Sequence, residues 1–195
     1  MVITHVTASG SQLLDYIAEN RVEIGFCAAH VFTKQVILRQ AAIRKLEYHP
    51  IGDVMTGIYV AKNNPRFSDK DTVVDFEKIK NMPIIKIARR EFNAPTLLEQ
   101  LITTAGVTLN PSHELIVDNF GSLRSAIVMM DAYSISTYVS NRTLYDYEEA
   151  YPELRFIPFA PGTFHSEFGY IQRENSIRSP LVNELLNNLK RRFTI

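Results

Sequence analysis

The feature that most constrains the fold is the alternation, along the whole chain, of short apolar segments with amphipathic ones. Residues 22–28 and 84–88 are rich in small and branched side chains, as buried strands are. Leu13, Leu14 and Ile17 instead recur at the spacing of one helix face. This pattern predicts an α/β fold in which helices cover both faces of a largely parallel sheet.

Composition narrows the class of protein. With 195 residues, 46% hydrophobic and 22% charged, the chain is expected to form one globular domain or two small ones. Lys plus Arg equals Asp plus Glu at 21 each, so the basic excess typical of nucleic-acid-binding domains is missing. The single cysteine, Cys27, excludes an internal disulfide, and we find neither a secretory signal nor a membrane-length apolar stretch. We therefore expect a soluble cytoplasmic protein.

Residues that typically begin or end helices, together with short apolar segments, predict further elements. We expect a strand over residues 35–38 and a helix that begins with Asn93 as N-cap and stops at Gly106. Asn119 is expected to cap a later helix, in which the two methionines at 129–130 fill the core.

The sequence lacks the usual signatures of an enzyme or a cofactor site. The five histidines lie far apart, and no nucleophile elbow or paired cysteine accompanies them. The nearest approach to a metal pair is His165 with Glu167, and two such residues are more often exposed or hydrogen-bonded than metal ligands. There is no glycine-rich phosphate loop either. We predict no catalytic residues, no metal and no cofactor.

Three loops supply the positive signal for ligand binding. In a parallel sheet, ligands lie beyond the carboxyl ends of the strands, where helix N-termini present free amide groups. The loops in such positions are residues 7–11, 89–93 and 118–122. Arg89 is the side chain best suited to hold a carboxylate or a phosphate. For each loop taken alone, ordinary helix capping is the alternative interpretation.

The order of elements resembles the effector-binding domain of LysR-type transcriptional regulators over nearly the whole chain. Three segments carry the resemblance: Val22-Glu-Ile-Gly-Phe26; Ile58-Tyr-Val-Ala-Lys-Asn-Asn-Pro65 with Val74-Asp-Phe-Glu-Lys-Ile79; and Gly169-Tyr-Ile-Gln-Arg173 before Ser179-Pro180. That family is similar in fold to type 2 periplasmic binding proteins.

The resemblance implies two Rossmann-like subdomains joined by two crossovers, with a small-molecule effector in the cleft between them. Subdomain I would comprise residues 1–54 and 161–195, and subdomain II residues 55–160. Carried over by position, the effector-binding residues are Ser9, Gly10, Ser11, Cys27, Ala28, Arg89, Asn93, Asn119 and Phe120.

The resemblance also implies partners. The family's domain opens with a further strand and helix before residue 2, and its helix-turn-helix precedes those, so DNA would be bound only through a missing N-terminal part. Effector binding would rearrange a homo-oligomer that has no membrane contact. Two other classes remain open: a solute-binding protein for transport, which would need an export signal, and an enzyme on a related two-lobed scaffold.

Overall fold

The computed structural model describes residues 6, 8–88, 96–138 and 151–193. Contacts between these residues divide the chain into two compact units. Unit 1 consists of the described residues up to Gly52 together with those from Glu167 onward, and unit 2 lies between them in the sequence. Hydrogen bonds join the strands in the order β1 (Gly25–His30), β7 (Ser166–Arg173), β2 (Leu46–Ala61), β5 (Tyr133–Tyr138), β3 (Ile84–Ile87) and β4 (Glu114–Val117), and β6 (Leu154–Pro158) also pairs with β2.

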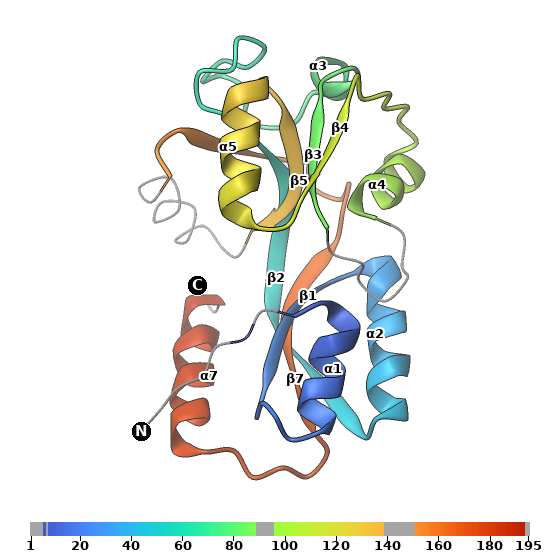
Figure 1. Cartoon of the computed structure of the whole chain (residues 1–195), viewed down its shortest axis with the longest axis vertical. Coiled ribbons are helices and arrows are strands. Elements are labelled where there is room, and N and C mark those ends of the chain that lie inside the picture. The colour runs from blue at the N-terminus through green and yellow to red at the C-terminus, as the bar shows by residue number, and fades with distance from the viewer. Residues whose placement is uncertain (1–5, 7, 89–95, 139–150, 194–195) are drawn as a thin grey trace. The chain divides into compact units, whose positions relative to one another are not determined.

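Unit 1 contains β1, β7 and the first part of β2, with helices on both faces of these strands (Figure 1). Its elements are α1 (Gly10–Ala18), β1 (Gly25–His30), α2 (Val31–Ile43), the first part of β2 (Leu46–Ala61), β7 (Ser166–Arg173) and α7 (Pro180–Phe193). Leu14, Ile17 and Ile37 pack from α1 and α2 against Ile171 on one face of β7. Val182 and Leu186 of α7 pack against Tyr170, the next residue of that strand. Alternation along β7 thus separates two apolar layers.

Unit 2 continues β2 and, among the described residues, adds seven elements. They are α3 (Phe76–Ile79), β3 (Ile84–Ile87), α4 (Leu97–Ala105), β4 (Glu114–Val117), α5 (Phe120–Met130) and β5 (Tyr133–Tyr138), followed by β6 (Leu154–Pro158). β3 is parallel to β4 and β5, whereas β5 and β6 are antiparallel to β2. The sheet is therefore mixed, and the expectation of a largely parallel sheet was too simple.

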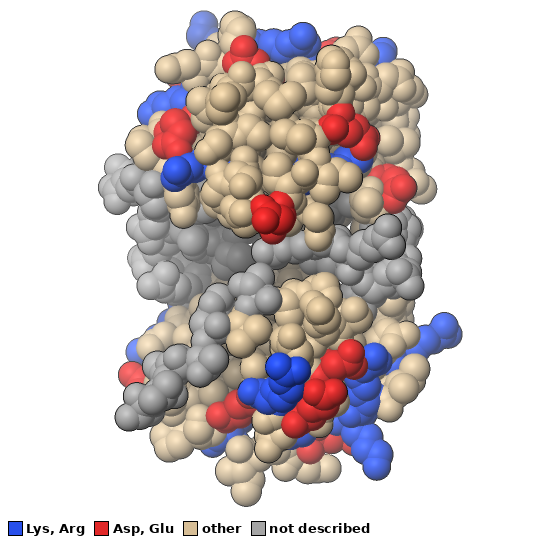
Figure 2. Space-filling view, in the orientation of Figure 1, with Lys and Arg blue, Asp and Glu red and all other residues tan. Residues whose placement is uncertain are grey.

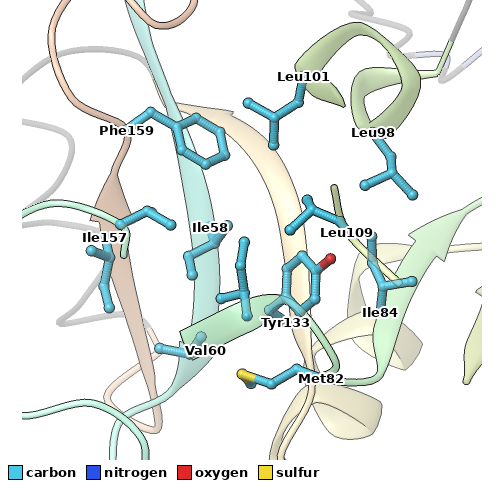
Figure 3. Packing of buried hydrophobic residues seen from close by; sticks show 12 residues of the cluster. Ile58, Val60, Met82, Ile84, Leu98, Leu101, Leu109, Tyr133, Ile157 and Phe159 are labelled. Atoms are coloured by element: carbon cyan, nitrogen blue, oxygen red, sulfur yellow. The ribbon is translucent and has the colours of Figure 1, made fainter. Parts of the chain in front are cut away.

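The two faces of unit 2 carry different helices. α3 and α4 cover the cluster that contains Ile58, Ile84 and Tyr133, whose packing is shown in Figure 3. α5 covers the opposite face through Leu123 and Ile127. Adjacent strand residues point to opposite clusters, so each strand of the middle of the sheet contributes to both.

Several predicted elements are confirmed. Helix α1 buries Leu14 and Ile17, and Asn20 follows it with a φ of 61°. The Asn119 side chain caps α5 by accepting a hydrogen bond from the Ser122 amide at 2.9 Å. Gly106 ends α4 in the left-handed conformation, as expected.

Three other predictions were wrong. Residues 35–38 lie inside α2, because the buried residues Thr33, Ile37 and Ala41 recur every four positions and place one helix face against the sheet. Helix α4 is capped not by Asn93 but by Thr96, which forms a capping box with Glu99. The methionines at 129–130 are not core fillers, since Met129 is 84% exposed.

Candidate functional site

The first predicted loop forms the N-terminus of α1 in unit 1. Ser9 is its N-cap, and both the amide and the hydroxyl of Ser9 donate to Gln12 Oε1, at 3.2 and 3.0 Å. Gly10 and Ser11 form the first turn, where backbone N–H groups have no partner within the helix. The structure thus brings Ser9, Gly10 and Ser11 together at one helix end that can accept an anion.

Strand β1 carries Cys27 and Ala28 at its centre and ends at His30, so the strand end expected at Cys27 and Ala28 lies two residues later. Both residues are half-buried, and Cys27 packs at the margin of the cluster formed by Leu14, Ile17 and Ile37. Because α1 precedes β1 in the chain and packs on it, the helix N-terminus and the strand C-terminus belong to the same edge of unit 1. We call this edge the unit 1 edge; Ser9, Gly10 and Ser11 lie on it, and Cys27 and Ala28 lie on the strand that ends there.

An ion pair that sequence reasoning missed lies on the unit 1 edge. Lys34, in the first turn of α2, places Nζ 2.9 Å from both carboxylate oxygens of Glu167, the second residue of β7. The Glu167 side chain is only 11% exposed, whereas that of Lys34 is 38% exposed. A carboxylate buried to this extent is stable only beside a cation or hydrogen-bond donors.

Tyr48 of β2 completes this group. Burial, then the facing Glu167 carboxylate and Cys27, raises the pKa of Tyr48 well above its usual range. Its hydroxyl is buried and has no hydrogen bond of regular geometry within the described residues. Gly169 makes room for it, because a Cβ at Gly169 would collide with the Tyr48 hydroxyl. Lys34, Tyr48 and Glu167 are hereafter called the unit 1 polar group.

His30 closes β1 and stands as N-cap of α2. It is 5% exposed, and burial lowers its pKa to about 4, so the imidazole is neutral at pH 7. Its backbone amide donates to Thr33 Oγ1 at 2.9 Å. His30 therefore contributes no positive charge to this edge near neutrality.

In unit 2, the predicted residues Asn119 and Phe120 are held by their own helix and core. Asn119 Oδ1 caps α5, while Nδ2 donates to Asp118. The ring of Phe120 packs edge-on against Tyr59 and tilted against Tyr151. Asn119 also borders an open hollow of about 680 Å³ between β4 and α5, which Leu115, Ser125 and Met129 line as well. Here the predicted side chains act first as a cap and as a packing residue.

The remaining predicted site residues, Arg89 and Asn93, lie outside the described residues. Within the described part of the chain, no three His, Cys, Asp or Glu side chains are grouped as a metal site would require. His165 and Glu167 do not act together either, since His165 is exposed and lies 3.8 Å from Asp53. Charges of both signs are interspersed on the face seen in Figure 2, with no continuous basic patch there.

Comparison with known proteins defines the class of fold. No protein-family model matches the sequence, and no curated protein matches it. Solved structures do match. The effector-binding domain of QuiR in complex with shikimate is 11% identical, with a TM-score of 0.61, over 94% of this chain and 77% of that one. The reduced regulatory domain of OxyR2 from Vibrio vulnificus is 13% identical, with a TM-score of 0.61 and coverages of 94% and 78%.

The LysR family transcriptional regulator CbnR matches as well. It is 11% identical, with a TM-score of 0.62, over 96% of this chain, which spans 58% of the CbnR chain. The chain thus has the mixed α/β fold of LysR effector-binding domains, and the predicted resemblance is confirmed at the level of fold. No helix of the described part is long and apolar enough to cross a membrane.

Proposed function

We propose that this chain is the small-molecule effector-sensing domain of a LysR-type transcriptional regulator. The observation that carries the proposal is the match of 94 to 96% of the chain to the effector-binding or regulatory domains of such regulators. A binding module, not an enzyme, is the function we propose, because the matched structures are regulators and their domains.

The proposed effector site lies between two subdomains, residues 1–54 with 161–195 and residues 55–160. It takes in the unit 1 edge with Ser9, Gly10, Ser11, Cys27 and Ala28, together with Arg89, Asn93, Asn119 and Phe120. We add the unit 1 polar group, because it adjoins Cys27 and holds a buried hydroxyl that lacks a regular hydrogen bond.

We propose an anionic effector. The N-terminus of α1 and the predicted Arg89 both favour negative charge. Two of the matched domains were solved with anions, shikimate for QuiR and sulfate for a mutant of OxyR2. Lys34 adds little attraction for an anion, since Glu167 neutralises it. The helix end and Arg89 would therefore hold the anionic group, and Tyr48 would offer a hydroxyl to the rest of the ligand.

DNA binding would belong to a part of a longer cytoplasmic protein. Net charge is zero over the 195 residues, and the chain spans 58% of CbnR, which has been solved at full length with its target DNA. The chain covers 77 to 78% of the matched QuiR and OxyR2 domains. Effector binding would then be transmitted through a homo-oligomer.

A thermal-shift series with shikimate, sulfate and a set of aromatic and aliphatic carboxylates tests the proposal. A true effector at about a hundred times its Kd should stabilise the fold by about 2.7 kcal/mol. The Ser11→Ala, Arg89→Ala double variant should lose this shift, and Arg39→Ala, which removes an exposed arginine from α2, should keep it. Absence of stabilisation by every anion, or equal shifts in both variants, would refute the proposed site.

A further inference from the structure

We propose that Phe193, in the last turn of α7, fastens the two strands that connect the units and thereby restrains movement of one unit against the other. The chain passes from unit 1 to unit 2 within β2, between Gly52 and Asp53, and returns between Ser166 and Glu167. Phe193 contacts β2 and β7 beside both of these points.

The first contact is with Gly52, the last residue of β2 that belongs to unit 1. A Cβ at Gly52 would lie 2.5 Å from Phe193 Cδ1 and 2.9 Å from Phe193 Cβ and Cγ. The glycine therefore allows the ring to lie directly on the strand backbone, closer than any other residue would permit.

The second contact is with Phe168, two residues after β7 re-enters unit 1. The rings of Phe168 and Phe193 stack with centroids 5.8 Å apart and planes 7° from parallel. Phe26 of β1 stacks on the other side of Phe168 at 5.8 Å and 5°. Aromatic stacks of this geometry add directional attraction to the apolar burial. One side chain of α7 is thus tied to β2 and, through Phe168, to β7 and β1.

Unit 2 fastens the same strands on its own side. Thr56 Oγ1 of β2 and Ser166 Oγ of β7 share a buried hydrogen bond of 2.9 Å, and the Phe159 amide donates to the Thr56 carbonyl at 2.9 Å. The exposed pair of His165 and Asp53, 3.8 Å apart, adds little. These contacts hold β2 on both sides of the step from Gly52 to Asp53, and they hold β7 on both sides of the step from Ser166 to Glu167.

These contacts make Phe193 a positioning residue for β2 and β7, the two strands that connect the units. Removal of its ring would free the strands on the unit 1 side alone and would leave the Thr56–Ser166 bond in place. A role of this restraint in effector sensing rests on the proposed function. The contact of Phe193 with β2 and β7 exists whether or not the chain senses an effector. The restraint can therefore be measured on the ligand-free protein, and a negative result would leave the effector hypothesis standing.

Amide hydrogen exchange of the full chain, read by mass spectrometry or NMR, tests the proposal. Phe193→Ala should raise exchange over residues 50–56 and 164–168 by about tenfold or more, with no comparable rise in α1, α2 or β3. Leu185→Ala, which removes a 42% exposed apolar side chain from the same helix, is the matched control and should leave these segments unchanged. Phe193→Tyr should behave as the parent chain.

Equal exchange in Phe193→Ala and Leu185→Ala would overturn the proposal, and so would a rise spread evenly over unit 1. If Phe193→Ala detaches α7 altogether, Gly52→Ala gives an independent answer. It displaces the ring from the strand while keeping every apolar side chain of α7, and it should raise exchange at residues 50–56 by several-fold without exposing Val182 and Leu186. Unchanged exchange in Gly52→Ala would equally refute the restraint.

Discussion

Each unit buries a tyrosine hydroxyl, but in opposite surroundings. Tyr133 Oη of unit 2 lies among the hydrocarbon side chains of Leu109, Ile84 and their neighbours (Figure 3), without a hydrogen-bond partner among the described residues. Burial, and to a lesser extent Glu114, raises its pKa. Tyr48 Oη of unit 1 instead faces a carboxylate that is itself paired with Lys34.

This difference teaches how to interpret a buried polar atom. In unit 2 the ring of Tyr133 fills space in the core. Burying its hydroxyl without a hydrogen bond costs free energy, and the packing of the ring offsets this cost. In unit 1 the hydroxyl belongs to a charged group on the edge where α1 begins and β1 ends. Charges are costly to bury, so a group of this kind suggests a role in recognition more strongly than a single hydroxyl does.

Two glycine substitutions should show the largest difference between the units. At Gly57 a Cβ would run into the Ile157 carbonyl oxygen and would lie 2.7 Å from Pro158 Cα, both backbone atoms of β6. At Gly169 it would meet only the side chain of Tyr48. We expect Gly57→Ala to destabilise the protein by about 3 kcal/mol and Gly169→Ala by about 1 kcal/mol, since a side chain can rotate and a paired strand cannot. Urea unfolding of both variants checks this, and similar losses would contradict it.

The unit 1 edge should also make stability depend on pH. The pKa of His30 falls from 6.5 to about 4 on folding, so the unfolded chain binds the extra proton between these values. This contribution to stability is complete above pH 6.5 and is lost as the pH falls towards 4, by a total of about 3 kcal/mol. His30→Gln should reduce the change of the unfolding free energy with pH between pH 6.5 and 4. His165→Gln, at an exposed position, should leave this pH dependence as it is in the parent chain. An unchanged slope in His30→Gln would show that other groups carry the dependence.

Two glutamate–lysine pairs, one from each unit, offer a third contrast. Glu167 in unit 1 is 11% exposed, whereas Glu114, which lies 2.8 Å from Lys86 in unit 2, is 47% exposed. Glu167→Gln should cost about 2 kcal/mol because it leaves the half-buried Lys34 ammonium beside a neutral amide. Glu114→Gln should cost less than about 1 kcal/mol, as for other exposed pairs. Chemical denaturation at low and high salt distinguishes them, and a strong salt dependence of the Glu167 effect would contradict its assigned burial.

Local signals explain which parts of the fold were predictable. The cap at Asn119 and the stop at Gly106 are short-range features, and the structure has both. The prediction of a strand over residues 35–38 rested on their branched side chains, and it was wrong. The side chains of α2 that face the sheet recur every four residues, which is the spacing of a helix. The prediction that Met129 fills the core was wrong because α5 packs on the sheet through Leu123 and Ile127, on another face of the helix.

The candidate site likewise has a short-range part, which could be predicted from the sequence, and a long-range part, which could not. A hydroxyl-rich helix start after an apolar segment is visible in sequence, and Ser9, Gly10 and Ser11 do form one. Lys34 and Glu167 are 133 residues apart, and only the placement of β7 beside β2 and α2 brings them together. The available signal was one acidic residue inside an otherwise apolar strand, in the sequence Ser-Glu-Phe-Gly-Tyr-Ile from 166 to 171. That signal indicates a buried charge but does not identify its partner.

The smallest expected effect returns to the two tyrosines. Tyr133→Phe removes a hydroxyl that lacks a partner in the described core and keeps the ring, so stability should stay unchanged or rise by up to about 1 kcal/mol. Tyr48→Phe should change stability little as well, but it should weaken the thermal shift given by an effector, because the lost hydroxyl belongs to the proposed site. Calorimetric unfolding with and without the stabilising anion separates the two outcomes. If Tyr133→Phe weakened the ligand shift and Tyr48→Phe did not, the recognition role would pass from the unit 1 polar group to unit 2.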